Sequence, residues 1–252
     1  MYEEIGVSII TPVYNSDEFL PTAINSVLNQ SHQLFELIII EDLGSKPTSL
    51  NIYDPRIRIL KNTLERGAGV ARYIGIKNSK YPLIAFIDSD DIWHETKLTD
   101  QIEYMKKFNL SFSFTGYQTC KNDNVVGEYI ANDAFSFSAF LGKEITICCS
   151  SVIFDKSHYR DLDVPRLKKR NDYELWAQLF QNSNEGRGKV GNIPQCLTIR
   201  RIHRNNLTKN IWLLPYYNFL FYFKVTKSVT LSIYWMMVNI INTLKRIIKN
   251  GA

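Results

Sequence analysis

Residues 83–91, LIAFIDSDD, join a short apolar run to a group of acidic side chains. The run from Leu83 to Ile87 is continuous, which predicts a strand buried on both faces, because a half-exposed strand would alternate polar and apolar residues. The strand is expected to end at Asp88-Ser89-Asp90-Asp91. In parallel sheets flanked by helices, ligands bind at the carboxyl ends of the strands. The stretch therefore predicts a parallel α/β sheet with a functional site at this end.

The segments before and after this stretch alternate between strands and helices. Strands are predicted at Val7–Val13, Phe35–Ile40 and Ile57–Lys61. Helices are predicted after residues 15–18 (with Leu20, Ile24, Val27 and Leu28 on one face), over 69–78, and over 96–108 (with Leu98, Ile102 and Met105 on one face). Strands separated by helices predict a doubly wound, mostly parallel central sheet.

Polar residues follow three of the predicted strands. They are Tyr14-Asn15, Glu41-Asp42 and Asp88 to Asp91. Because the carboxyl ends of parallel strands share one edge of the sheet, these residues are expected to converge on one site.

The acidic cluster Asp88, Asp90 and Asp91 would repel itself strongly unless a cation lay among the carboxylates. Oxygen-only ligands suit Mg²⁺ or Mn²⁺, and these ions bridge carboxylates to substrate phosphates. The alternative is a solvated turn with a helix cap, since Asp is common in both. The position at the end of a strand favours the metal.

Two further segments could carry chemistry. Residues 66–72, RGAGVAR, open a helix and could present backbone N–H groups to a phosphate, although a plain helix start explains the glycines equally well. Residues 170–176, RNDYELW, place Asp172 at the start of another helix. Asp172 is either an N-cap or a general base, and the residues alone do not separate the two.

The second half of the chain is more mixed. A strand is predicted at 145–154, a helix at 172–181 with Leu175, Leu179 and Phe180 buried, and a strand at 196–202. None of the four cysteines has C-x-x-C spacing, so a zinc or thioredoxin-like site is not expected. Cys148 and Cys149 are expected to point to opposite faces of their strand.

The last segment, 211–252, is predicted to be a helical tail attached to a domain of residues 1–210. It is rich in aromatics (Trp212, Tyr216, Tyr217, Phe219 and Tyr222) and carries Lys224, Lys227, Lys245 and Arg246. The uncharged run 228–244 is interrupted by Ser, Thr and Asn, which favours a helix lying at a membrane surface over one that spans it. Packing on the domain and a homodimer interface are the alternatives.

Composition and charge narrow the class of protein. With 45% hydrophobic and 22% charged residues among 252, the chain is expected to fold as a globular protein. A net charge of +5 suits contact with phosphates or an anionic membrane, and no basic arm interleaved with aromatics indicates nucleic acid. The N-terminus has no signal-peptide pattern, so a cytoplasmic location is expected, with attachment to the inner face of the cell membrane through the tail.

Five segments, in order, resemble the inverting glycosyltransferases of family 2, which have the GT-A fold; the sequence after Trp93 is similar to bacterial members that build surface polysaccharides such as O-antigen and capsule. The match extends over about residues 5 to 210. The segments are VSIITPVYNSDEFLPTAINSVLNQS (7–31), FELIIIEDLGS (35–45), GVARYIGI (69–76), FIDSDDIW (86–93) and RNDYELW (170–176).

The resemblance implies roles for individual residues. Thr11, Pro12 and Tyr14 would line the nucleotide pocket, Asp42 would hold the base, and Arg72 would lie near the base or diphosphate. Asp88-Ser89-Asp90 matches the DXD motif, with Asp90 the direct metal ligand beside Asp88. Asp172 matches the catalytic base, and Arg201 and His203 resemble a segment that contacts the diphosphate and closes over it.

Two positions depart from the family pattern. The second strand ends in Glu41-Asp42-Leu43-Gly44-Ser45, one residue longer than the usual Asp-Asp-Gly-Ser, which leaves open whether Glu41 or Asp42 reaches the base. The base motif reads Asn171-Asp172 in place of Glu-Asp, and the aspartate is retained.

The expected activity is metal-dependent transfer of a hexose, with inversion, from a nucleotide sugar to a lipid-linked oligosaccharide, and the resemblance favours a UDP-sugar. A nucleotidyltransferase is the rival enzyme, but TPVYNSDEF (11–19) has neither the glycine nor the basic residue of its phosphate loop. A nucleotide-sugar-binding module without catalysis is the other alternative. The donor sugar, the acceptor and the linkage do not follow from the sequence.

Overall fold

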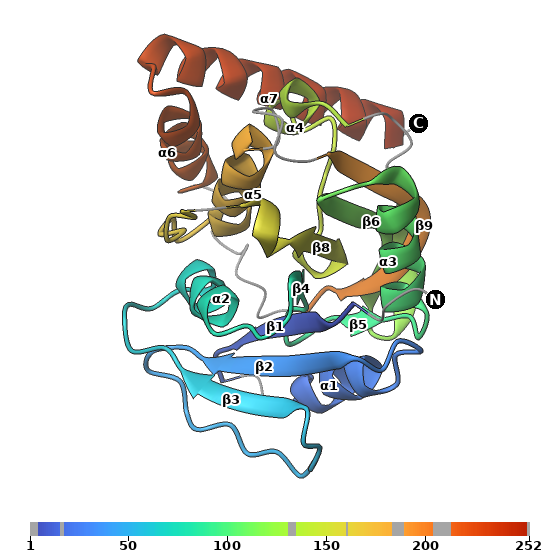
Figure 1. Cartoon of the computed structure of the whole chain (residues 1–252). Coiled ribbons are helices and arrows are strands. Elements are labelled where there is room, and N and C mark those ends of the chain that lie inside the picture. The colour runs from blue at the N-terminus through green and yellow to red at the C-terminus, as the bar shows by residue number, and fades with distance from the viewer. Residues whose placement is uncertain are drawn as a thin grey trace.

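A computed structural model describes residues 5–15, 18–130, 135–159, 161–182, 189–203 and 213–250 of the chain. One mixed sheet of nine strands runs through these residues, in the order β3-β2-β1-β4-β8-β6-β9-β5, with β7 paired to β6 (Figure 1). The strands are β1 (Val7–Val13), β2 (Phe35–Glu41), β3 (Ile57–Lys61), β4 (Leu83–Phe86), β5 (Ile92–Trp93), β6 (Phe112–Lys121), β7 (Asn124–Tyr129), β8 (Val152–Asp155) and β9 (Val190–Arg201). The α-helices are α1 (Leu20–Leu28), α2 (Ala68–Lys77), α3 (Lys97–Phe108), α4 (Phe137–Leu141), α5 (Asn171–Asn182), α6 (Leu214–Thr226) and α7 (Val229–Asn250).

Strands β1 to β4 form the parallel half of the sheet, as the apolar runs predicted. Successive residues of each strand face opposite cores. Ile10 and Phe86 pack with residues of α2 and α5, whereas Ile9 and Ala85 pack with residues of α1 and α3. Burial on both faces is the physical reason for a continuous apolar sequence. The predicted doubly wound fold is confirmed.

The pairing of β1 with β4 ends at Ile10 and Phe86, two residues before Pro12. Beyond that point β1 pairs only with β2, so the missing N–H of Pro12 interrupts no ladder on the β4 side. The order 3-2-1-4 makes the gap between β1 and β4 the point where the winding of the sheet reverses. Ligands of doubly wound sheets bind at such a switch point.

The second half of the sheet mixes directions and corrects one prediction. Strand β8 covers only Val152–Asp155, and Cys149–Ser151 form a 3-10 turn, so the predicted strand 145–154 is mostly wrong. Cys148 is the N-cap of that turn and Cys149 its first residue; both are buried, and they do not alternate across a strand. The apolar residues before β8 are buried without strand pairing, a case that periodicity does not distinguish from a strand.

The start of α1 also differs from the prediction. Its N-cap is Phe19, which makes no side-chain cap hydrogen bond, and Pro21 lies in the first turn. Proline fits this position because the first N–H groups of a helix have no partner within the helix. Of the polar residues expected to start this helix, Ser16 and Asp17 lie outside the described residues.

The C-terminal segment forms two helices, α6 at the upper left and α7 along the top of the molecule in the view of Figure 1. Helix α6 contributes Phe221 and Tyr222 to the core that contains α5, and the Tyr222 hydroxyl donates a hydrogen bond to the Leu141 carbonyl at 2.7 Å. The proposed boundary near residue 210 lies outside the described residues. Among the helices described, none is both long and apolar enough to cross a membrane.

Lys97, at the start of α3, is fully buried, and its ammonium group lies 4.0 Å from the centroid of the Trp93 ring. Its Nζ has no hydrogen-bond partner within the described part of the chain, and burial lowers its pKa well below the usual value. Because the unfolded chain then binds more protons than the folded one, the free energy of unfolding should rise with pH up to the unfolded pKa.

Lys97→Met should therefore raise the free energy of unfolding near pH 7 by roughly 1–3 kcal/mol, because it removes a buried group without hydrogen bonds. It should also flatten the pH dependence. Urea unfolding of both proteins at about pH 7 and about pH 9.5 measures both effects. Lys107→Met, an exposed position on the same helix, is the control. A less stable Lys97→Met protein with an unchanged pH slope would contradict the analysis.

Candidate active site

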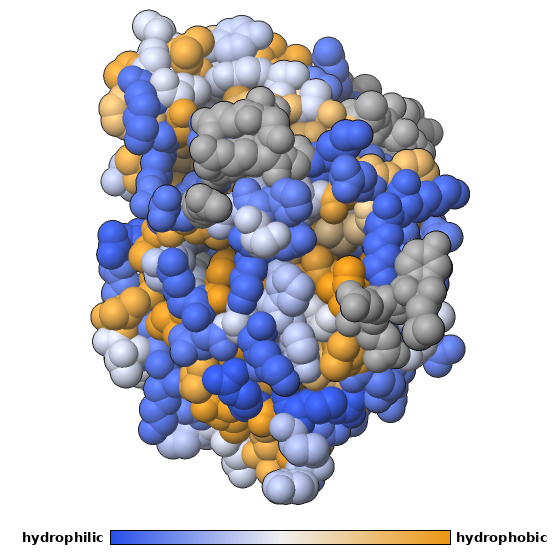
Figure 2. Space-filling view, viewed as in Figure 1, coloured by the Kyte–Doolittle hydropathy of each residue, from blue (hydrophilic) through white to orange (hydrophobic). Residues whose placement is uncertain are grey.

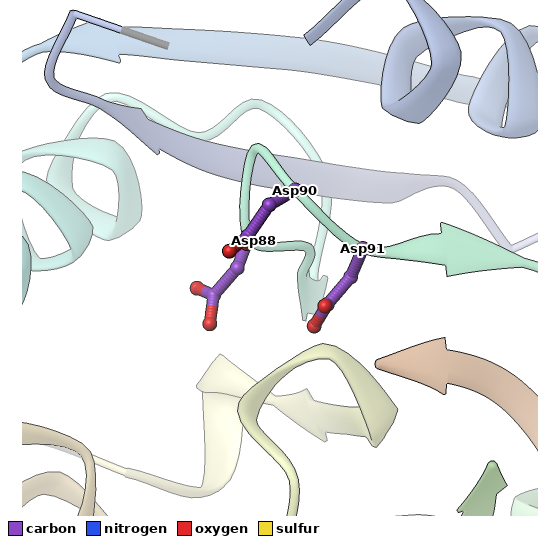
Figure 3. Close-up of side chains that lie close together, drawn as sticks. All are labelled: Asp88, Asp90 and Asp91. Atoms are coloured by element: carbon purple, nitrogen blue, oxygen red, sulfur yellow. The ribbon is translucent and has the colours of Figure 1, made fainter. Parts of the chain in front are cut away.

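Asp88, Asp90 and Asp91 lie together in the loop between β4 and β5 (Figure 3). One carboxylate oxygen from each residue lies within 4.8 Å of those of the other two. The loop follows the last β1–β4 pair, so the cluster stands at the switch point of the sheet. The acidic cluster predicted for the end of this strand is therefore present.

The three carboxylates have different surroundings. Asp91 is buried, and both of its oxygens accept hydrogen bonds, from the Ser150 hydroxyl at 2.5 Å and from the Arg201 backbone N–H at 3.1 Å. Its contacts tie the loop to the turn before β8 and to the end of β9. Asp88 and Asp90 are partly exposed and remain accessible to a ligand.

Negative charge is crowded in the cluster. Burial, followed by the charge of Asp88, raises the pKa of Asp90. Burial, with the charges of Asp88 and Asp90, raises the pKa of Asp91 well above its usual value. A cation would reverse these shifts, and hard carboxylate oxygens are the ligands that Mg²⁺ and Mn²⁺ prefer. The residues present therefore fit a divalent metal site.

Arg72 of α2 connects the acidic cluster to α5. Its guanidinium donates to Asp88 Oδ1 at 2.5 Å and to Asn171 Oδ1 at 3.0 Å, and the side chain is almost fully buried. Arg72 thus lies beside the loop that carries the acidic cluster, and its expected place near a base or diphosphate stays a prediction. A planar guanidinium can hold two acceptors in fixed directions, which an ammonium group cannot do.

Gly69 allows this contact. A Cβ at Gly69 would lie 2.4 Å from the Pro165 carbonyl oxygen and 2.7 Å from Asn171 Cβ, so only glycine lets α2 approach the start of α5 this closely. The segment 66–72 thus shows a packing role for one of its glycines. Its other glycine, Gly67, has a φ of 150° and donates its N–H to Asp42.

Asp172 lies in the first turn of α5, next to Asn171. It is partly exposed, and among the described residues no side-chain hydrogen bond or ion pair involves its carboxylate. Through Arg72 it is linked to Asp88 by two hydrogen bonds and one peptide bond. A carboxylate placed in this way, near the acidic cluster and accessible, can accept a proton.

The end of β9 closes the other side of the cluster. His203 Nε2 lies 2.8 Å from Asp90 Oδ2, and its ring centroid is 5.0 Å from that of Phe19. The Arg201 guanidinium lies 5.1 Å from the same Phe19 ring. Both residues expected in the diphosphate segment therefore contact the cluster or its surroundings.

A second polar group lies at the ends of β1 and β2. Asp42 accepts hydrogen bonds from Asn62 Nδ2 at 2.8 Å and from the Gly67 N–H at 3.0 Å. The Arg66 guanidinium lies 4.0 Å from the centroid of the Tyr14 ring. Glu41, in contrast, is buried and accepts a hydrogen bond from the Thr48 N–H. Asp42 is thus the more accessible of the two acidic residues.

The remaining predicted residues occupy the same edge of the sheet. Thr11 is buried within β1, Pro12 is half-buried at the opening beside β4, and Ser89 lies between the two partly exposed aspartates. Sequence reasoning missed Ser150 and Phe19 and gave no contact role to Asn171. Ser150 had no signal, because its stretch carries no motif and its partners are distant in the chain.

A doubly wound sheet with a carboxylate cluster at its switch point is suited to bind phosphate-bearing ligands through a cation. The chain belongs to glycosyltransferase family 2: the family model described as Glycosyl transferase family 2 matches residues 8–161. It is a glycosyltransferase, and the nucleotidyltransferase alternative is excluded.

Two relatives are similar over most of their length. The Escherichia coli protein named UDP-Glc:alpha-D-GlcNAc-diphosphoundecaprenol beta-1,3-glucosyltransferase WfgD is 35% identical over 181 residues, covering 71% of each chain. The Bacillus subtilis protein named putative teichuronic acid biosynthesis glycosyltransferase TuaG is 32% identical over 213 residues, covering 82% of each chain.

Solved structures share the fold. S. aureus TarS 1-349 in complex with UDP-GlcNAc matches with a TM-score of 0.69 and 14% sequence identity, covering 93% of this chain and 70% of that chain. At this identity the likeness concerns the fold alone. It agrees with the GT-A fold expected from the motifs.

Arg72→Lys should lower turnover by about 10- to 100-fold, because a lysine cannot hold Asp88 and Asn171 together. The concentration of Mn²⁺ needed for half-maximal activity should rise as well, since Asp88 loses its orientation. Release of nucleoside diphosphate during glycosyl transfer measures both. Arg58→Lys, in the ion pair with Glu36 away from the cluster, is the matched control. Equal losses in the two variants would argue against a specific role for Arg72.

Proposed function

We propose that the chain transfers a hexose from a UDP-sugar to a hydroxyl group of a lipid-linked saccharide, with inversion at the anomeric carbon and with Mn²⁺ or Mg²⁺ bound. The observation that carries the proposal is the link from Asp88 through Arg72 to the residue before Asp172. This link supports the proposal, because it connects a cluster that fits a metal with the helix turn that carries an accessible carboxylate.

The comparisons support the choice of donor and acceptor. The name of the E. coli relative specifies UDP-glucose as donor and an undecaprenol-diphosphate-linked GlcNAc as acceptor. A second E. coli relative, WfaP, has the same activity in its name and is 32% identical over 207 residues. We therefore assign this chain a UDP-hexose, with UDP-glucose as the first candidate, and a lipid-diphosphate-linked saccharide of surface polysaccharide synthesis.

Asp90 and Asp88 are the proposed metal ligands. Both are partly exposed, whereas both oxygens of Asp91 are already engaged. A bound Mn²⁺ or Mg²⁺ would neutralise charge on the leaving nucleoside diphosphate. Arg201 and His203, next to the same cluster, are the proposed contacts of the diphosphate.

Asp172 is the proposed general base. Its carboxylate takes the proton of the acceptor hydroxyl as that oxygen forms a bond to the anomeric carbon. The bond from that carbon to the diphosphate oxygen breaks at the same time, and the electron pair leaves with the nucleoside diphosphate. One displacement from the opposite face inverts the configuration.

The nucleotide base is proposed to bind at the ends of β1 and β2. Tyr14, stacked with Arg66, offers an aromatic face, and Asp42 offers a carboxylate that already accepts a backbone N–H. Thr11, Pro12 and Ser89 complete this edge. We propose that the enzyme works at the cytoplasmic face of the membrane, where residues 1–210 carry the catalysis and 211–252 form the tail.

The first test is calorimetric titration of UDP with Mn²⁺ and with EDTA. Wild-type binding should need the metal, and Asp90→Ala should weaken it by at least about tenfold, because a direct ligand is lost. Glu103→Ala, an exposed carboxylate on α3, should bind as the wild type does. Binding that is equally strong in EDTA would exclude the metal site; no binding at all would point to another nucleotide.

The second test concerns the base. Asp172→Asn should keep UDP binding and lose turnover by about 10²- to 10⁴-fold, since the amide cannot accept the proton. Asp163→Asn, an exposed aspartate before α5, is the control. Full turnover by Asp172→Asn would refute the assignment. Metal-dependent binding without any transfer by the wild type would indicate a silent binding module.

A further inference from the structure

Helix α7 has an unusual distribution of polar residues. On the side that faces the domain, Ser232 and Asn239 are buried, and Asn239 Nδ2 donates to the Tyr222 hydroxyl at 2.9 Å. Asn242 Nδ2 donates to the Gly142 carbonyl at 3.0 Å. These hydrogen bonds, together with Trp235 and Met236, which pack against the hydrophobic core, hold α7 along the surface of the domain.

The opposite side of α7 is apolar and exposed. Its residues recur every three or four positions, as expected for one face of a helix, and each side chain is 45–60% exposed. We call this set the outer stripe: it comprises Ile233, Tyr234, Met237, Ile240, Ile241 and Leu244. A helix covered only by water on that side would carry polar residues there.

Further exposed apolar residues lie near the outer stripe. Phe223 at the end of α6 and Val229 at the start of α7 are both exposed. Figure 2 shows orange and pale side chains along the upper rim of the molecule, where Figure 1 places α7. Exposed contiguous apolar surface of this kind marks an interaction site.

The positive charge of the C-terminal segment indicates what kind of partner the outer stripe binds. No Asp or Glu follows Glu185 in the sequence, whereas the segment 213–252 contains Lys224, Lys227, Lys245, Arg246 and Lys249. Lys227 lies between α6 and α7, and Lys245 follows the outer stripe. A second copy of the chain would place like charges opposite one another, which costs free energy. An anionic lipid surface satisfies the apolar stripe and the cations together.

We infer that the outer stripe of α7 docks on an anionic membrane surface, with the helix lying in the plane of the headgroups. Tyr234 in the middle of the stripe suits that depth, since aromatic rings with a polar end collect at the interface. Lys227 and Lys245 meet the lipid headgroups from both ends of the stripe.

The docking surface is rigidly coupled to the start of α5. The Tyr173 ring stacks on Phe140 and meets Phe221 edge to face, and Arg170 Nε donates to Asn218 Oδ1 at 2.9 Å. Helix α6 thus contacts Arg170 and Tyr173, which flank Asp172 in the sequence. A docked α7 would therefore set the height of the proposed base above the membrane. This consequence rests on the proposed function, which supplies the lipid-linked acceptor.

Vesicle flotation of the full chain tests the inference. The probes are vesicles of phosphatidylglycerol with phosphatidylethanolamine and vesicles of phosphatidylcholine alone. The protein should float with the anionic vesicles only, and high salt should weaken the association. The double variant Met237→Gln/Ile241→Gln should bind at least about tenfold more weakly. Val125→Gln/Val126→Gln, an equally exposed apolar pair on β7, should bind like the wild type.

The outcomes separate docking from catalysis. A wild type that stays unbound, or a Met237→Gln/Ile241→Gln variant that floats equally well, overturns the inference. Concentration-dependent dimers in sedimentation velocity that disappear in this variant, without vesicle binding, would assign the stripe to a second copy instead.

Transfer to a short-chain, water-soluble acceptor should be unchanged in the variant, while transfer to a lipid acceptor in vesicles should fall. Failure with both acceptors in the wild type would count against the proposed function and leave the flotation result to stand by itself.

Discussion

The crowding of three carboxylates at the end of β4 is the constraint on which the site depends. Their mutual repulsion is offset by groups brought from separate parts of the chain: Ser150 before β8, the backbone of Arg201 at the end of β9, and Arg72 from α2. Each of these contacts also holds an element in place around the switch point of the sheet. Burial, and after it the neighbouring carboxylates, still raise the pKa values of Asp90 and Asp91, so the residues present fit a divalent cation.

Arg72 connects the acidic cluster to the first turn of α5. Because Arg72 donates to both Asp88 and Asn171, it ties the loop that carries the acidic cluster to the first turn of α5. Asn171, which departs from the Glu expected at this position, accepts the hydrogen bond from Arg72 through its amide oxygen. Helix α6 contacts the same turn through Asn218 and Phe221, so a chain of direct contacts connects the tail, α5 and the acidic cluster.

Much of the fold was accessible from the sequence. The parallel strands β1 to β4 were predicted within a residue or two, because burial on both faces leaves a continuous apolar run. The prediction failed over most of 145–154, where only Val152 to Phe154 belong to a strand, and β6 and β7 were not predicted. These segments belong to the mixed half of the sheet, where pairing is set by partners distant in the chain. The tail was ambiguous for the same reason, since only packing shows which side of a helix is covered.

By itself, the sequence determined the class of the sheet, the position of Asp88, Asp90 and Asp172 at the ends of elements, and the family. These follow from local rules: periodicity, strand ends and motif order. Tertiary structure alone decided that Asp91 is an anchor and that Arg72 bridges Asp88 and Asn171. It also decided that α7 turns Ser232 and Asn239 inward and leaves the outer stripe exposed. Each of these depends on contacts between residues about 15 to 110 positions apart, because long-range packing, rather than local preference, sets which polar groups are buried together.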